Sequence, residues 1–230
     1  MEKVSKENKF KAIGISRLRM GSDGEGVTTL VAAYGCPLRC KYCLNPMCFQ
    51  PDYKIEEYTV ESLIDEVVID DLYFKATGGG IVFGGGEPLL FADFIHKFRQ
   101  KCPPEWKISL ETSLSVPQSQ LEKIITDIDF FLVDCKDMNP EIYKKYTGKS
   151  QDEFLSNLIY LRDKKLQEKV RVRIPLIPEY NTEANQQASI RTLEELGFSN
   201  FDTFCYNVEV ASRKAESLKA KTKARVDKSK

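Results

Sequence analysis

The segment Gly35-Cys-Pro-Leu-Arg-Cys-Lys-Tyr-Cys-Leu-Asn-Pro46 places three cysteines, at positions 36, 40 and 43, in the spacing Cys-x3-Cys-x2-Cys. Three thiolates on one short loop can converge on a single metal centre. The chain carries seven cysteines, an odd number, and its first residues are charged and polar, unlike those of a secretory signal. A disulfide framework is therefore not expected, and the three clustered cysteines need a chemical explanation.

Two kinds of metal centre fit this spacing. A structural zinc site would need a fourth ligand, for which Cys48 or the single histidine, His96, is available. An iron–sulfur cluster held by Cys36, Cys40 and Cys43 would leave one iron open, as catalytic metal sites leave a coordination position free for a ligand. The spacing favours the reactive cluster over zinc.

Short apolar or alternating runs recur along the chain, and the first of them leads directly into the cysteine segment. The predicted strands are Val27–Gly35, Ile81–Gly85, Lys107–Thr112, Phe130–Cys135, Lys169–Pro175 and Phe201–Tyr206. Amphipathic stretches between them predict helices over Val60–Lys75, Phe91–Lys101, Gln118–Asp127, Gln151–Lys164 and Thr182–Leu196. This alternation predicts a parallel sheet covered by helices, either an open doubly wound sheet or a full or partial barrel.

Chemically suggestive residues follow these strands. In both architectures functional side chains gather at the carboxyl ends of the strands. A glycine-rich turn follows the second strand, an acid–threonine pair ends the third, a charged pair ends the fourth and an arginine ends the fifth: Gly84–Glu87, Glu111–Thr112, Asp134 with Lys136, and Arg173. Asp134 and Lys136 alternate with Cys135, so both should face the same side of their strand. One rim is therefore expected to hold these residues together with the cysteines.

Taken in order, these motifs resemble those of the radical S-adenosylmethionine (SAM) superfamily, and within it the pyruvate formate-lyase activating enzyme group. The resemblance covers about Gly21 to Tyr206. Its motifs are the cysteine segment with Tyr42 before the last cysteine, Asp23-Gly-Glu-Gly-Val-Thr-Thr29, Gly85-Gly-Glu-Pro88, Glu111-Thr112, Asp134-Cys-Lys136, Tyr146-Thr-Gly148 and Arg173-Ile-Pro-Leu-Ile-Pro178.

The resemblance implies an α/β fold, a partial (β/α)6 TIM-type barrel. It also implies a [4Fe-4S] cluster on Cys36, Cys40 and Cys43, with the amino and carboxylate groups of SAM on the open iron. An electron that enters the cluster would then cleave SAM to methionine and a 5′-deoxyadenosyl radical. The difficult chemistry would belong to the cofactors, and the protein would orient them.

The resemblance further implies roles for individual residues. Gly85, Gly86, Glu87 and Pro88 would contact the methionine amino group of SAM. Glu111, Thr112, Asp134 and Lys136 would surround SAM and an associated monovalent cation, with Lys136 neutralising the SAM carboxylate. Arg173 would contact SAM, and Tyr42 would pack on the adenine or the cluster. From the residues alone, a tight turn, an ion pair at the rim and a core tyrosine remain alternatives.

The function implied by the resemblance is that of a glycyl radical enzyme activating enzyme, which acts on a large partner enzyme and receives electrons from a flavodoxin or ferredoxin. Two alternatives stay open. One is a radical SAM enzyme that acts on a small molecule or peptide, as deazapurine carboxylate synthases do; the other is a zinc-binding interaction module. Gly24-Glu25-Gly26 and Asn207, which stands near a family histidine, keep the first alternative open. Glu25 and Thr28 stand where the family usually has Pro and Arg, a departure that concerns the contacts with the substrate and the SAM ribose.

Composition sets the remaining limits. The 230 residues include 34 basic and 34 acidic side chains, which argues against a broadly basic nucleic-acid-binding protein. No apolar run is long enough for a membrane helix. We therefore expect a cytoplasmic protein. The resemblance implies one radical SAM domain at residues 1–212, and its oxygen-sensitive chemistry implies an anaerobic organism. Residues 213–230, with eight basic and two acidic side chains, are expected to form a solvated tail.

Overall fold

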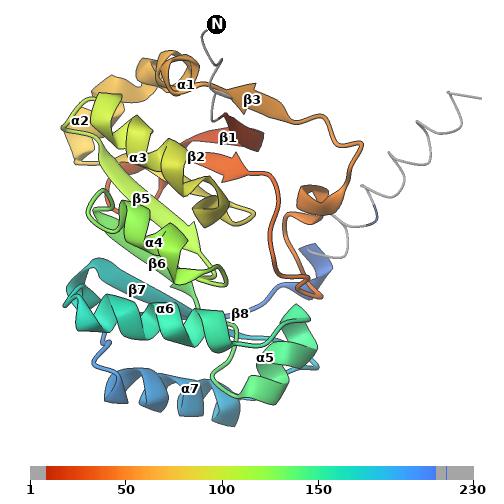
Figure 1. Cartoon of the computed structure of the whole chain (residues 1–230). Coiled ribbons are helices and arrows are strands. Elements are labelled where there is room, and N and C mark those ends of the chain that lie inside the picture. The colour runs from red at the N-terminus through yellow and green to blue at the C-terminus, as the bar shows by residue number, and fades with distance from the viewer. Residues whose placement is uncertain (1–8, 211–215, 217–230) are drawn as a thin grey trace, which may run out of the picture.

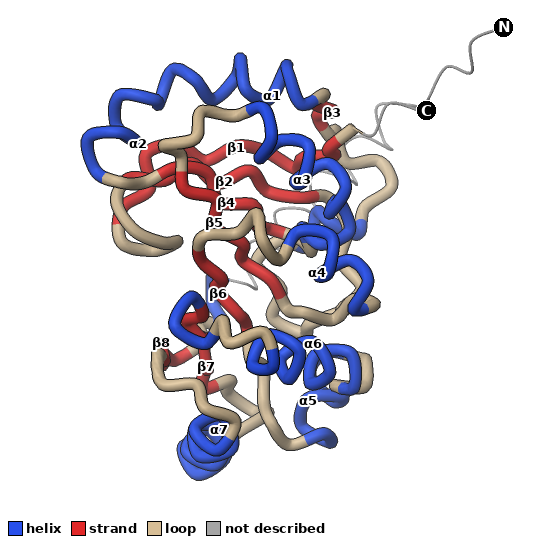
Figure 2. The backbone as a smooth tube through the Cα atoms, turned by 60° about the vertical axis from the view of Figure 1, so that its left-hand side comes forward, coloured by secondary structure: helices blue, strands red, loops and turns tan. Residues whose placement is uncertain are grey.

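The computed structural model describes residues 9–210 and Glu216. One eight-stranded sheet, in the order β3-β1-β2-β4-β5-β6-β7-β8, runs through the molecule (Figures 1 and 2). Its last six strands in this order pair in parallel. They are β2 Val27–Ala33, β4 Gly80–Gly85, β5 Lys107–Thr112, β6 Phe130–Asp134, β7 Val170–Leu176 and β8 Phe201–Cys205. All six were predicted from the sequence, and together they form the expected partial (β/α)6 barrel.

Two antiparallel strands extend this sheet and were not predicted. They are β1 Phe10–Met20, which pairs with β2, and β3 Glu56–Tyr58, which pairs with β1. The pairing of β1 with β2 shifts register twice, between Ala12 and Gly14 and between Ser16 and Arg19. Such bulges interrupt the period of two by which a strand is recognised in a sequence.

The helices lie mainly along one face of the sheet (Figure 2). Five predicted helical stretches are present, the first of them divided in two by a short 3-10 turn, and α5 was not predicted. The helices are α1 Val60–Val67, α2 Asp71–Thr77, α3 Ala92–Lys101, α4 Gln118–Ile124, α5 Pro140–Thr147, α6 Asp152–Asp163 and α7 Glu183–Glu195. Short 3-10 helices span η1 Pro46–Phe49, η2 Val68–Asp70, η3 Pro88–Phe91 and η4 Gln167–Lys169.

The two faces of the sheet differ because side chains alternate along each strand. In β5, Ile108 and Leu110 belong to the apolar core under the helices. Ser109 and Glu111 alternate with them and so point to the opposite, concave face. The concave face therefore carries polar groups, and the loops at the carboxyl ends of the strands close over one end of it.

Two expectations concern parts of the chain away from this sheet. The predicted basic tail, residues 213–230, lies outside the described residues apart from Glu216. Among the described helices, none combines the length and the apolar character that a membrane span requires.

Candidate active site

The cysteine loop leaves the carboxyl end of β2 and is held from several sides. The backbone N–H groups of Arg39 and Lys41 donate hydrogen bonds to the carbonyl oxygens of Thr147 (2.8 Å) and Tyr146 (3.1 Å) in the last turn of α5. The side chain of Leu38, within the loop, is buried and lines the cavity beside it. Because these contacts use backbone groups, the path of the loop is fixed independently of most of its side chains.

The three cysteines of this loop face one cavity of about 260 Å³. All the predicted site residues line it except Tyr42, Glu87 and Pro88: Cys36, Cys40, Cys43, Gly85, Gly86, Glu111, Thr112, Asp134, Lys136 and Arg173. Elements from β2 to β7 thus bring together residues that are spread over more than half of the chain.

The donor set fits a polynuclear cluster better than a single metal ion. Within the part of the chain that the structure describes, no group of three or more His, Cys, Asp or Glu side chains could share one metal ion. Cys48, the candidate fourth zinc ligand, is buried and donates its S–H to the Ala33 carbonyl oxygen at 3.5 Å. His96 lies on α3, with Nδ1 2.7 Å from the Asp127 carboxylate. Three thiols around a shared cavity suit a larger inorganic core.

Burial governs the protonation of these thiols. Desolvation raises the pKa of Cys36 well above its ordinary value, and it raises the pKa of Cys40 to about 11. Both side chains are therefore neutral near pH 7 in the metal-free chain. Binding of a cluster must release their protons, because thiolates are the ligands that iron requires.

The glycine-rich turn after β4 packs closely against the start of the cysteine loop. A Cβ atom at Gly85, whose φ is +87°, would lie 2.7 Å from the Ala32 Cβ, and one at Gly86 would overlap the Gly35 carbonyl oxygen. The Gly86 and Glu87 N–H groups donate to the carbonyl oxygens of Ala33 and Gly35 at 3.0 and 2.9 Å. Close packing of the two segments thus accounts for the glycines, and it also leaves their backbone exposed to the cavity.

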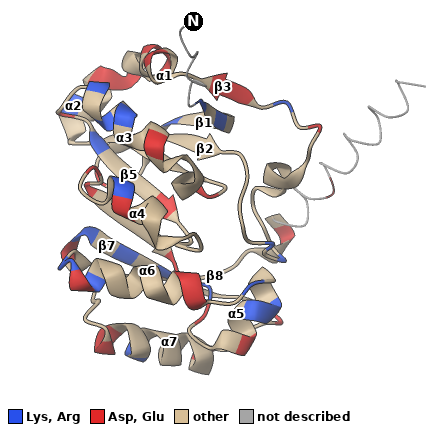
Figure 3. Ribbon diagram, in the orientation of Figure 1, with Lys and Arg blue, Asp and Glu red and all other residues tan. Residues whose placement is uncertain are grey.

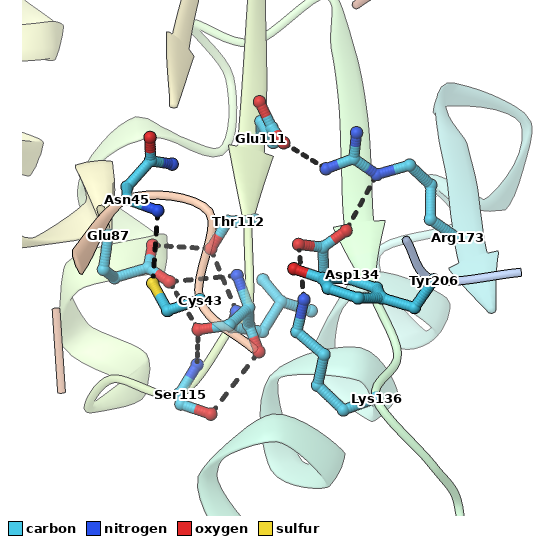
Figure 4. Close-up of polar contacts among 12 residues, drawn as sticks. Cys43, Asn45, Glu87, Glu111, Thr112, Ser115, Asp134, Lys136, Arg173 and Tyr206 are labelled. Atoms are coloured by element: carbon cyan, nitrogen blue, oxygen red, sulfur yellow. Dashed lines mark hydrogen bonds and ion pairs between the residues drawn. The ribbon is translucent and has the colours of Figure 1, made fainter. Parts of the chain in front are cut away.

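Glu87 is fully buried behind the cavity wall (Figure 4). Its carboxylate accepts hydrogen bonds from Thr112 Oγ1 (2.6 Å), from the Ser113 N–H and hydroxyl (2.9 and 2.6 Å) and from the Leu89 N–H (3.2 Å). Burial raises the pKa of Glu87, although these hydrogen bonds act in the opposite direction. The side chain therefore fixes the end of β5 and turns away from any ligand in the cavity.

A charged network forms the opposite wall (Figure 4). Arg173 Nε donates to Asp134 Oδ1 at 2.8 Å, and its Nη2 donates to Glu111 Oε1. Lys136 Nζ donates to Asp134 Oδ2 at 2.8 Å. Burial alone would raise the pKa of Asp134, but Arg173 and Lys136 lower it to about 2. Asp134 and Lys136 share one side of the chain, as their spacing predicts, while Cys135 is buried on the other.

Aromatic side chains surround Tyr42, the residue before the last cysteine. The ring of Tyr42 stacks on that of Tyr206, with centroids 6.3 Å apart, and meets Tyr180 edge to face at 5.7 Å. The Tyr42 hydroxyl donates to Glu179 Oε2 at 2.8 Å, and the Tyr206 hydroxyl donates to the Tyr42 carbonyl oxygen. In this arrangement Tyr42 braces the loop, and Tyr146 and Tyr206 line the cavity.

Several lining residues were not singled out from the sequence: Leu44, Asn45, Ser113, Tyr146, Phe204 and Tyr206. Asn45 Nδ2 donates to the Gly85 carbonyl oxygen at 2.9 Å, and the Asn45 N–H approaches Cys43 Sγ at 3.4 Å. Leu44, Asn45 and Tyr146 lie within the quoted motifs, which is the signal that could have identified them.

The three departures from the family pattern lie at two places. Arg19 pairs with Thr28 across β1 and β2, and its guanidinium contacts the buried Asp23 carboxylate. A guanidinium thus lies beside the position where the family carries one at residue 28. Asn207 is exposed after β8, and its Oδ1 accepts a hydrogen bond from the Val210 N–H at 3.1 Å.

Proteins of known family share these features. The profile of the radical SAM superfamily matches residues 30–188. The (2S)-3-sulfopropanediol dehydratase activating enzyme of Klebsiella oxytoca is 30% identical over 220 positions, which cover 69% of each chain. The pyruvate formate-lyase-activating enzyme of Listeria monocytogenes is 32% identical over 169 positions, which cover 68% of this chain and 64% of the relative.

Solved structures agree on the fold. Streptococcus suis SuiB bound to S-adenosylmethionine superposes with a TM-score of 0.61 at 13% identity, over 77% of this chain and 40% of SuiB. A radical SAM methyltransferase from Sphaerobacter thermophilus superposes with a TM-score of 0.58 at 18% identity, over 85% of this chain and 64% of the methyltransferase.

Proposed function

Because the chain belongs to the radical SAM superfamily, an enzyme family that uses a [4Fe-4S] cluster and SAM, we propose that it is a glycyl radical enzyme activating enzyme. The observation that carries this proposal is the cavity that the three cysteines share with the glycine turn and the charged wall. The similar activating enzymes are named for a second enzyme that each activates, which supports a protein partner as the substrate. The backbone glycine as the site of the radical is what the family resemblance implies.

In this proposal the residues of the cavity bind and orient the cofactors. Cys36, Cys40 and Cys43 would bind the cluster as thiolates, and Lys136 and Arg173 would provide N–H donors for the SAM carboxylate. The chemistry that the bound cluster and SAM supply is a one-electron cleavage of a carbon–sulfur bond, which releases a 5′-deoxyadenosyl radical. The side chains around the mouth then limit access of water to the reacting atoms.

The mouth of the cavity suits a protein substrate. Leu44 and Phe204 both line it and remain 38% and 39% exposed, respectively. Neighbouring side chains of β8, including Asp202 and Thr203, are exposed as well. Exposed apolar side chains beside a polar site favour contact with a second macromolecule, such as the segment of a partner enzyme that carries the glycine.

The length of the matched region supports a single cluster. The alignment with the Klebsiella relative is 220 positions long but includes only 69% of the 230 residues of this chain. At about 60 positions of the alignment the relative therefore has a residue and this chain has a gap. The alignment with the Listeria relative is 169 positions long and includes 68% of this chain, so this chain has a gap at only about 13 of its positions. This chain therefore resembles the compact relative, and one cluster accounts for its cysteine motif.

An electron must reach the cluster from outside, and we infer an acidic flavodoxin or ferredoxin as its source. Basic side chains are exposed on the cysteine loop, on α5 and just after α5 (Figure 3): Arg39, Lys41, Lys144, Lys145 and Lys149. The backbone contacts of Arg39 and Lys41 with the end of α5 bring these two groups together. A positive surface beside the cluster would steer an acidic donor to it.

The test uses the anaerobically reconstituted protein with SAM, a reductant and candidate glycyl radical enzymes, including those encoded beside its gene. The expected result is a glycyl radical signal in electron paramagnetic resonance spectra, absent when the partner's glycine is replaced by alanine. Cleavage of SAM that a small metabolite stimulates, with no glycyl signal from any partner, would instead support the small-molecule alternative.

A further inference from the structure

The side chain of Arg39 closes the first turn of the cysteine loop. In an ordinary turn over residues 36–39, the N–H group of the fourth residue would donate to the carbonyl oxygen of the first. Here the Arg39 N–H donates instead to the Thr147 carbonyl oxygen on α5, at 2.8 Å. Arg39 Nη1 supplies the missing donor, at 2.6 Å from the Cys36 carbonyl oxygen and 2.9 Å from that of Leu38. One residue therefore both anchors the loop to α5 and holds its turn together.

The guanidinium of Arg39 is also held from the side of η1. Its Cζ lies 4.1 Å from the centroid of the Phe49 ring, where the flat cation can stack on the aromatic face. Arg39 thus joins three segments, namely the cysteine loop, η1 and α5. Lys41 offers a contrast on the same loop. Its N–H donates to the Tyr146 carbonyl oxygen, but within the described residues its side chain takes part in no hydrogen bond, ion pair or cation–π contact.

The position of Arg39 in the loop makes these contacts important for the cysteines. Cys36 begins the turn and Cys40 directly follows Arg39, and both line the same cavity as Cys43. The three thiols must become thiolates to bind iron, and like charges at short range repel one another. A loop with an open turn could carry Cys36 away from Cys40, whereas the closed turn keeps both side chains at the cavity.

We propose that Arg39 is a positioning residue of the cluster site, whose guanidinium keeps Cys36 and Cys40 directed at the cavity and thereby slows loss of the iron–sulfur cluster. Three cysteines around one cavity fit such a cluster. The effect is one of preorganisation, because a turn that is already closed loses less conformational freedom when the cluster binds. This role rests on the cluster of the proposed function but not on the identity of the partner enzyme.

The rate of iron release from the cluster-loaded protein tests this proposal. It is followed through the absorption of a ferrous chelator under anaerobic conditions, without SAM or an electron donor. Arg39→Ala removes two hydrogen bonds from a charged donor and the contact with the Phe49 ring, and we expect iron release to be at least about threefold faster. A smaller increase would overturn the proposal. Arg39→Lys keeps the charge but lacks the flat guanidinium, and its rate should lie between those of the wild type and Arg39→Ala.

Lys41→Ala is the matched control, because it removes the same charge from the same loop without a loss of side-chain contacts. Its iron release should stay within about twofold of the wild-type rate. Equal acceleration in Lys41→Ala and Arg39→Ala would show that the charge alone matters, and would also overturn the proposal.

A second variant covers the case in which Arg39→Ala does not fold, which urea unfolding of the metal-free chain reveals. Phe49→Leu removes only the ring against which the guanidinium packs, and should accelerate iron release by at least about twofold. An unchanged rate in that variant would contradict the proposed role of Arg39. Wild-type protein that binds no iron would contradict the proposed function together with this role, whereas equal release from all variants would contradict this role alone.

Discussion

Asn45 donates a hydrogen bond from its side-chain amide to the Gly85 carbonyl oxygen, 2.9 Å away, and so joins the cysteine loop to the glycine turn. The bond is partly buried and links residues 40 positions apart in the chain. It holds together the two segments that we propose to carry the cluster and the methionine part of SAM. Asn45 therefore acts as a positioning residue between two binding surfaces.

Replacement of Asn45 by alanine should weaken SAM binding while the cluster still assembles. One lost hydrogen bond of this kind costs about 1 kcal/mol, which corresponds to about a fivefold higher dissociation constant. Equilibrium dialysis with SAM measures the effect, and iron analysis reports cluster content. Gln100→Ala, an exposed amide on α3, is the matched control and should leave SAM affinity unchanged.

Each of Cys36→Ser, Cys40→Ser and Cys43→Ser should abolish cluster binding, because three thiolates are the complete protein ligand set in our proposal. Cys48→Ala should retain the cluster, since its buried thiol bonds the Ala33 carbonyl instead. Iron and sulfide analysis after anaerobic reconstitution measures this. Loss of the metal in Cys48→Ala alone, or recovery of zinc without iron, would contradict the three-ligand arrangement.

Glu87→Gln should destabilise the protein by about 2 kcal/mol, because one carboxylate oxygen that now accepts hydrogen bonds becomes an amide nitrogen. The hydroxyl of either Thr112 or Ser113 would then face the amide nitrogen and would lose its hydrogen-bond acceptor in the protein interior. Urea unfolding of the metal-free chain measures the change. The exposed Glu122→Gln on α4 is the control, and an equal effect there would argue against a specific role for the buried carboxylate.

The ionised Asp134 side chain should stabilise the folded protein at neutral pH, and this contribution should be lost at low pH. Its pKa is lowered to about 2 in the folded chain, below its ordinary value of 3.8. The folded state then binds this proton less readily than the unfolded state, so the stabilising effect is present above pH 3.8 and is lost as the pH falls through about 2. We expect the stability advantage of the wild type over Asp134→Asn to shrink by about 2 kcal/mol across this range, as measured by urea unfolding.

Lys41→Glu and Lys144→Glu should each weaken binding of an acidic flavodoxin by about threefold to tenfold, and the effect should fade as salt is added. Both side chains are exposed near the cysteine loop. Surface plasmon resonance at two salt concentrations measures the change. Lys97→Glu on α3 carries the same charge change on another element, and an equal loss of binding in that variant would show that the location of the charge has no importance.

The parallel strands could be predicted because they are short apolar runs followed by turns, and the cysteine spacing identified the loop. The antiparallel strand β1 was not predicted because its bulges break the alternation of apolar and polar residues on which strand prediction relies. Helix α5 had recognisable signals that were not used, namely the capping Asn139, Pro140 in the first turn and Gly148 in the left-handed conformation at its end.

The contacts between site residues that are far apart in the chain could not be predicted from the sequence. The strand-end residues were found because a parallel sheet brings its carboxyl ends together. The bond between Tyr206 and Tyr42 spans 164 positions, and the acceptors of the Asn45 and Thr112 side chains are likewise far along the chain. No local pattern encodes such pairs, because their geometry arises only when the whole sheet has formed.

The cysteine loop is anchored by α5, by the turn after β4 and by the residue that follows β8. Its conformational entropy has thus been given up when the protein folds, before any iron arrives. A free peptide of residues 35–46 would lose that entropy in the act of binding, and should hold an inorganic core far more weakly than the folded chain. The strength with which the loop holds a cluster therefore depends on the whole sheet that anchors it.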